Sequence, residues 1–86
     1  MIHDYVPLVH ALIDAFLFLE NSGDDEVDPD SAVRCMENIS SSLHTLEPSD
    51  QLALRLHFQQ IAEKTSDPGY RNFVRQLPDM IGLASA

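Results

Sequence analysis

The chain has 86 residues, 44% of them hydrophobic, so the sequence predicts one folded domain over residues 1–86 and not a disordered chain. Fourteen acidic residues against five lysines and arginines give a net charge of −9, which disfavours binding to nucleic acids and to anionic membranes. The single cysteine excludes an internal disulfide framework.

The N-terminal segment has none of the features of a targeting signal. Residues 11–19 are apolar except for Asp14, but this run is about half the length that a membrane span needs. Residues 1–10 contain no lysine or arginine, whereas a signal peptide begins with a basic region. We therefore expect a cytoplasmic protein, with no membrane partner and with a reduced thiol at Cys35.

Four prolines recur about every twenty residues: Pro7, Pro29, Pro48 and Pro68. Three of them follow an acid: Asp28, Glu47 and Asp67. Proline is tolerated in the first turn of a helix, and an acid just before it can cap the helix. The sequence therefore predicts helices over residues 5–21, 29–46, 48–64 and 68–77. The expected fold is all-α, a small four-helix bundle whose last helix is short and broken at Pro78.

The first predicted helix, with Asp4 as its cap, is apolar around most of its circumference. Its apolar side chains are Tyr5, Val6, Leu8, Val9, Leu12, Ile13, Phe16, Leu17, Phe18 and Leu19. A four-helix domain of this size cannot surround one helix completely, so part of this surface remains uncovered. The sequence therefore predicts self-association, as a homodimer through this helix.

The other three helices show narrower apolar faces. The second carries Met36, Ile39, Leu43 and Leu46, the third Leu54, Phe58 and Ile61, and the fourth Tyr70, Phe73, Val74 and Leu77. These spacings are typical of amphipathic helices with one face toward a core. After Pro78, the apolar residues Met80, Ile81 and Leu83 are expected to form a turn that lies back on this core.

The strongest compositional feature is the segment of residues 20–30, which has six acids and no base. These are Glu20, Asp24, Asp25, Glu26, Asp28 and Asp30. Helix capping explains the acids that flank Pro29, but it does not explain those before them, which repel one another. The sequence predicts that the six acids form a partner-binding surface, and a solvated loop is the alternative.

Residues that could bind a metal do not have the required spacing. The alternate acids from Asp24 to Asp30 imitate the first half of an EF-hand loop, but Pro29 takes the place of its glycine and Cys35 that of its final glutamate. His10 and Asp14 lie one helical turn apart, with His3 nearby, in no zinc-binding pattern. We therefore predict no metal and no other cofactor.

No arrangement of residues indicates an enzyme. Cys35 and His44 on one helix lie about 13 Å apart along its axis, too far to act as nucleophile and base. Cys35 is therefore expected to be a small core or boundary residue. Residues 60–76 have some likeness to a helix-turn-helix that would present Arg71 and Arg75, but the net charge opposes DNA binding. The alternative is that these arginines pair with acids.

In length, acidity and four-helix content the chain is similar to the colicin-type immunity proteins, small acidic bacterial proteins that neutralise nuclease toxins. The Tyr-Tyr-Pro segment of those proteins is absent here, so no binding residue is carried over. We expect a small acidic interaction domain that binds a basic protein partner and, as the resemblance implies, neutralises it. The alternative is a homodimeric helical scaffold or adaptor that uses its first helix as the interface and has no toxin partner.

Overall fold

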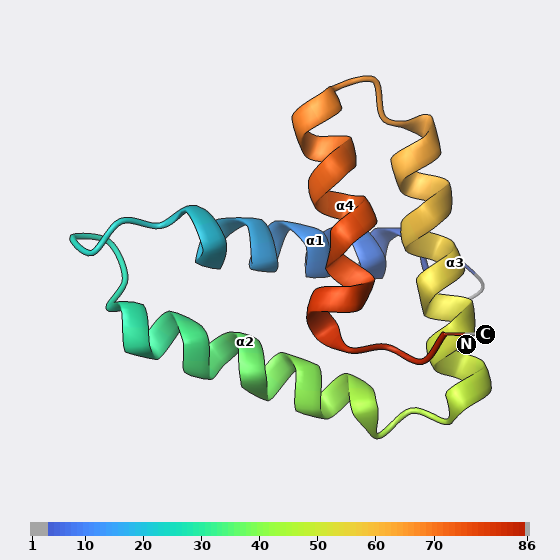
Figure 1. Ribbon diagram of the computed structural model, residues 1–86, viewed down its shortest axis with the longest axis horizontal. Coiled ribbons are helices and arrows are strands. Elements are labelled where there is room, and N and C mark those ends of the chain that lie inside the picture. Colours follow the sequence, from blue (N-terminus) through green and yellow to red (C-terminus); the bar gives the residue numbers. More distant parts are fainter. Residues whose placement is uncertain (1–3, 86) are drawn as a thin grey trace. The chain divides into compact units, whose positions relative to one another are not determined.

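The computed structural model describes residues 4–85, in which there are four helices and no strands (Figure 1). The helices are α1 (Val6–Asn21), α2 (Pro29–His44), α3 (Pro48–Lys64) and α4 (Pro68–Ile81). The predicted all-helical fold with four helices is thus confirmed. None of these helices, over the residues described, is both long and apolar enough to cross a membrane.

The chain divides into two compact units, which meet between Ser42 and Leu43. Unit 1 contains α1 and most of α2, and unit 2 contains the end of α2 with α3 and α4. Each unit is described by itself below. The bundle and the single domain over residues 1–86 stay predictions.

The helices begin where the prolines predict. Asp67 stands at the N-cap of α4, and its side chain accepts a hydrogen bond from the Tyr70 amide at 2.8 Å. The N-cap of α1 is Tyr5 and not the predicted Asp4, although Asp4 accepts a hydrogen bond from the Val6 amide at 3.0 Å. Each bond satisfies a backbone N–H that has no partner within the first turn of the helix. Glu47 stands at the N-cap of α3 but makes no capping bond with its side chain. The helix starts therefore follow the local sequence rules, although the acids cap them unequally.

In unit 1, α1 and α2 are joined by residues 22–28 (Figure 1). The buried side chains of α1 are Val9, Ile13 and Phe16, which recur at helical spacing, and that of α2 is Ala32. The second helix was predicted to reach residue 46, but it ends at His44. Pro48 disfavours helical backbone at the residue before it, Glu47, which is extended. The chain therefore leaves the helical conformation before α3 begins.

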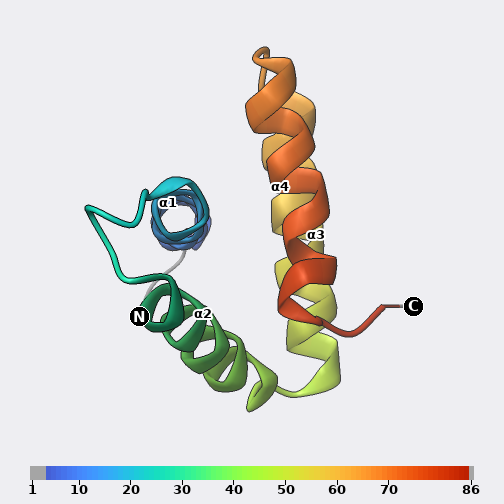
Figure 2. The same cartoon turned by 60° about the vertical axis from the view of Figure 1, so that its left-hand side comes forward.

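In unit 2, α3 and α4 run side by side in opposite directions (Figures 1 and 2). The buried apolar residues of this unit are Phe58, Ile61, Ala62, Val74, Leu77, Ile81 and Leu83. They recur every three or four residues along each helix, so one face of α3 and one face of α4 contribute to the core. The predicted role of Ile81 and Leu83 in covering the core agrees with their burial, whereas Met80 is exposed.

The last helix continues through Pro78 to Ile81, four residues beyond its predicted end. It ends at Gly82, whose φ of 81° is strained for any residue with a side chain. The amide of Gly82 donates to the carbonyl of Asp79, and that of Leu83 donates to the carbonyl of Pro78. These are the bonds of a Schellman motif. The helix therefore ends at a glycine cap and not at the proline.

Candidate functional site

The six predicted acids, here called the acidic surface, lie around the connection between α1 and α2 in unit 1. They are Glu20, Asp24, Asp25, Glu26, Asp28 and Asp30, and all six are exposed. Glu20 lies in the last turn of α1, four of the acids lie in the connecting loop, and Asp30 lies in the first turn of α2. All six carboxylates thus lie within residues 20–30, from the last turn of α1 to the first turn of α2.

The loop is held in shape by a turn around Gly23. The Gly23 carbonyl accepts hydrogen bonds from the amides of Glu26 at 2.9 Å and Val27 at 3.0 Å. The carboxylate of Glu26 accepts a longer bond, at 3.4 Å, from the Gly23 amide. Because the backbone itself closes this turn, the side chains of Asp24 and Asp25 are not needed to shape it.

Asp28 caps α2, as the sequence predicts. Its Oδ2 accepts hydrogen bonds from the Ser31 amide at 3.0 Å and from the Ser31 hydroxyl at 3.2 Å. Asp30, in the first turn, lies near the positive end of the helix dipole. Two of the six acids therefore have a structural role at the start of α2.

The remaining four acids, Glu20, Asp24, Asp25 and Glu26, are exposed. In the part of the unit that the structure describes, none of them forms an ion pair within 4 Å. Residues 4–42 contain nine acids and only one lysine or arginine, the exposed Arg34. Like charges so close together repel one another in the free protein. The negative charge of these acids is thus not compensated within the part of unit 1 that the structure describes.

We predict that Asp28→Ala lowers the free energy of unfolding by about 1 kcal/mol, because the capping bonds to Ser31 are lost. The triple change Asp24→Asn, Asp25→Asn and Glu26→Gln is expected to leave this free energy unchanged or slightly higher, because it relieves repulsion. Urea denaturation followed by circular dichroism measures both effects.

The matched control for the cap is Glu47→Ala, at an N-cap position whose side chain makes no capping bond. We expect it to change the unfolding free energy much less than Asp28→Ala does. Equal losses at the two positions would show that the bonds of Asp28 do not contribute, and a large loss in the triple variant would show that the loop acids serve folding.

Cys35 is exposed, so the prediction of a core or boundary position is wrong. It lies only about 60° around the axis of α2 from Ala32, the buried residue described on that helix, so the buried strip of α2 is too narrow to include Cys35.

The structure brings together no metal site in the residues that it describes. No group of three or more His, Cys, Asp or Glu side chains is placed there to hold an ion. Pro29 and Asp30 belong to α2, so the alternate acids do not form one continuous loop as an EF-hand requires. His10 and Asp14 are exposed on α1, and His3 lies outside the described residues.

The arrangement of α3 and α4 also differs from that of a helix-turn-helix. The helices α3 and α4 run antiparallel, whereas those of a helix-turn-helix cross at a steep angle. Arg71 donates from Nε to the Thr65 carbonyl at 3.0 Å and from Nη2 to the Ser66 carbonyl at 3.3 Å. It therefore bonds to the backbone that follows α3, where the sequence suggested that it would pair with an acid.

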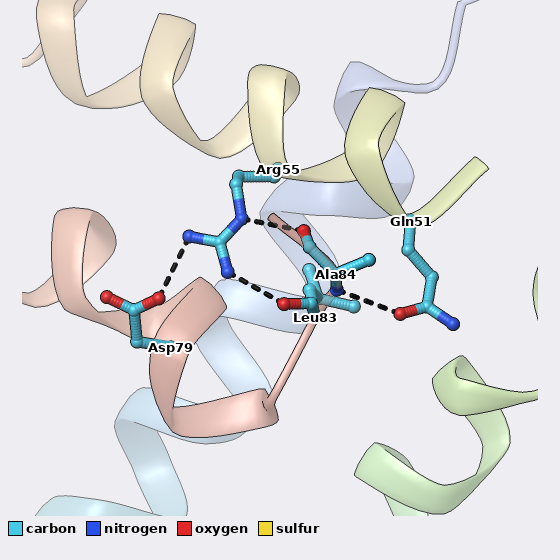
Figure 3. A network of polar contacts seen from close by, with 5 residues as sticks. All are labelled: Gln51, Arg55, Asp79, Leu83 and Ala84. Atoms are coloured by element: carbon cyan, nitrogen blue, oxygen red, sulfur yellow. Dashed lines mark hydrogen bonds and ion pairs between the residues drawn. The ribbon is translucent and has the colours of Figure 1, made fainter. Parts of the chain in front are cut away.

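Sequence reasoning missed a cluster of polar bonds that holds the C-terminal segment against α3 (Figure 3). Arg55 donates from Nε to the Ala84 carbonyl at 3.0 Å and from Nη2 to the Leu83 carbonyl at 2.8 Å. The Ala84 amide in turn donates to Oε1 of Gln51 at 2.9 Å. We call Gln51 and Arg55 the polar clamp. The available signal was two polar residues, four apart, on the same helix face as Phe58.

Two further hydrogen bonds lie beside the polar clamp. Nε2 of His44 donates to the Ile81 carbonyl at 2.7 Å, and Nε2 of Gln51 donates to the Leu46 carbonyl at 2.9 Å. Within unit 2, the first bond ties the end of α2 to the end of α4, and the second ties the loop after α2 to α3. His44 and Gln51 therefore serve the fold.

Neither a family model nor a curated protein nor a solved structure matches this chain.

Proposed function

We propose that this protein is a small acidic interaction domain that binds a basic protein partner through the acidic surface and neutralises it, in the manner of an immunity protein or antitoxin. The observation that supports the proposal is the exposure of all six carboxylates around one loop, without an ion pair in the described part of unit 1. Asp24 and Asp25 in particular have no capping role.

Charge of one sign gathered on one surface acts mainly on the rate of association. It raises the local concentration of an oppositely charged partner and steers its approach, and salt screens the effect. Rim charges of this kind change the association rate more than the dissociation rate. The effect of these acids on the association rate can therefore be measured separately from their effect on the free energy of unfolding.

The partner is first obtained by affinity capture from the source cell at low salt, with release by a salt gradient. We predict that the triple variant Asp24→Asn, Asp25→Asn and Glu26→Gln then associates with the captured protein several-fold more slowly at low salt, with a weaker salt dependence. The dissociation rate is expected to change less. Stopped-flow mixing at several salt concentrations measures these rates.

The control variant removes three acids from unit 2 and so has the same net charge: Glu47→Gln, Asp50→Asn and Glu63→Gln. If binding uses the acidic surface, the control slows association less than the triple variant does. Equal slowing in both variants would indicate that only total charge matters. An unchanged rate in the triple variant at low salt would show that the acidic surface is a solvated loop.

The second candidate is a homodimeric scaffold or adaptor that uses α1 as its interface. It is favoured by large apolar side chains that remain exposed on this helix, Leu8 and Phe18. Sedimentation over a range of concentrations tests it, since a dimer at micromolar concentration that Phe18→Gln separates into monomers would support the scaffold.

A further inference from the structure

Helix α1 carries an exposed apolar face in addition to its buried one. It consists of Leu8, Ala11, Ala15 and Phe18, which we call the α1 apolar face; Ala15 is half-buried and the other three are exposed. The spacing of three, four and three residues places these side chains on one side of the helix. Leu8 is 49% exposed and Phe18 is 55% exposed. The face lies about 150° around the helix axis from the buried residues of α1, so it is a separate surface.

The shape of the α1 apolar face fits another helix. The small side chains of Ala11 and Ala15 lie at its centre, and the large ones of Leu8 and Phe18 lie at its ends. Alanines let the backbone of a second helix approach closely, because the distance between packed helices depends on the side chains at the contact. The spacing is also that of the anchor residues with which helices bind one another.

The surroundings of the face are acidic. Asp14 is exposed one turn from Phe18 along the helix, and Asp4 is exposed before the first turn. Asp24 and Asp25 are exposed just beyond the other end of the helix. Acids therefore flank the apolar residues along one side and at both ends, as a charged rim surrounds the apolar centre of an interface.

Two occupants would cover the α1 apolar face: a second copy of this chain, or a helix of another protein. The negative charge of unit 1 favours the second. Residues 4–42 contain nine acids and one arginine, so a second copy would bring the same excess of negative charge to the interface. Like charges brought together across an interface suppress association. A helix with an apolar face and basic flanks is complementary in both respects.

We propose that the α1 apolar face binds a cationic amphipathic helix of the partner protein. Apolar side chains of that helix pack on Leu8, Ala11, Ala15 and Phe18, and its basic residues pair with Asp14 and the acidic surface. This inference rests on the proposed function, because it assigns the structural class of the element that the acidic surface attracts.

The test uses two synthetic peptides of eighteen residues, made of the same numbers of leucines and lysines. One has the leucines on a single helix face, and the other has them in scrambled order. Fluorescence anisotropy with the full chain at low salt is expected to show about tenfold tighter binding of the amphipathic peptide, because only this peptide can cover the apolar side chains.

The double variant Leu8→Gln and Phe18→Gln is expected to abolish this preference between the peptides. Both positions are half exposed, and circular dichroism checks that the variant keeps its helix content. The matched control is Leu56→Gln on α3, where the side chain is as exposed as that of Phe18. This control is expected to keep the preference.

The outcomes separate this inference from the proposed function. Equal binding of both peptides, weakened by the triple acid variant, would overturn the inference and support the acidic surface. A preference that survives Leu8→Gln and Phe18→Gln, or no binding at all, would also overturn it. A preference that persists in the triple acid variant, with the binding strength of both peptides also unchanged, would support the apolar face and count against the acidic surface. A dimer that excludes the peptide would make a second copy the occupant and overturn the inference.

Discussion

Replacing Phe58 with alanine is expected to lower the free energy of unfolding by about 3–5 kcal/mol. Phe58 has no exposed surface and is the largest of the fully buried side chains. Its removal deletes apolar burial and leaves a cavity that the surrounding helices cannot fill. A chain of this size has about 4–13 kcal/mol of stability in total, so the change threatens folding at 25 °C. Urea denaturation followed by circular dichroism at 222 nm measures the loss.

The control is Leu56→Ala, two residues away on the same helix but 55% exposed. We expect it to change the unfolding free energy by less than about 1 kcal/mol, because the leucine is largely in contact with water already. If the two variants lose equal stability, the burial of Phe58 in unit 2 is not what holds α3 in place.

The second large effect is expected at Arg55. We predict that Arg55→Ala lowers the free energy of unfolding by about 2–3 kcal/mol, since hydrogen bonds from a charged donor to the Leu83 and Ala84 carbonyls are lost together. Its side chain is 17% exposed, so water screens these bonds only in part. The same denaturation experiment measures the loss. Hydrogen exchange at Ala84 should also become faster, because the tail that its amide belongs to is released.

Two variants separate the contributions of Arg55. Asp79→Asn removes the ion pair at 2.9 Å, but the aspartate side chain is 79% exposed, so we expect a loss of no more than about 1 kcal/mol. Arg55→Lys keeps the charge but cannot form the forked bonds to two carbonyls, so it should resemble Arg55→Ala more than the unchanged protein. A loss in Asp79→Asn as large as that in Arg55→Ala would assign the stability to the ion pair and not to the polar clamp.

The positions of the helix starts could be predicted because they depend on neighbouring residues. A proline in the first turn and an acid before it act within four residues of each other, so no knowledge of the fold is required. The same holds for the exposure of the six acids. Carboxylates with no base nearby in the sequence lose solvation energy when they are buried, and they therefore stay in water.

The end of α4 at Gly82 depends on a local glycine cap that the prediction from Pro78 did not use, whereas the role of Arg55 was decided by the tertiary structure alone. Local rules placed the helix end before Pro78, but Gly82 caps the helix one turn later, and His44 and Arg55 bond to carbonyls of that last turn and of the tail. These partners lie 28 to 37 residues away in the chain. The sequence by itself determined which segments are helical and which surface is acidic, because both depend on local chemistry. Which apolar side chains of α1 are buried, and where the tail is held, depend on long-range packing that no local pattern contains.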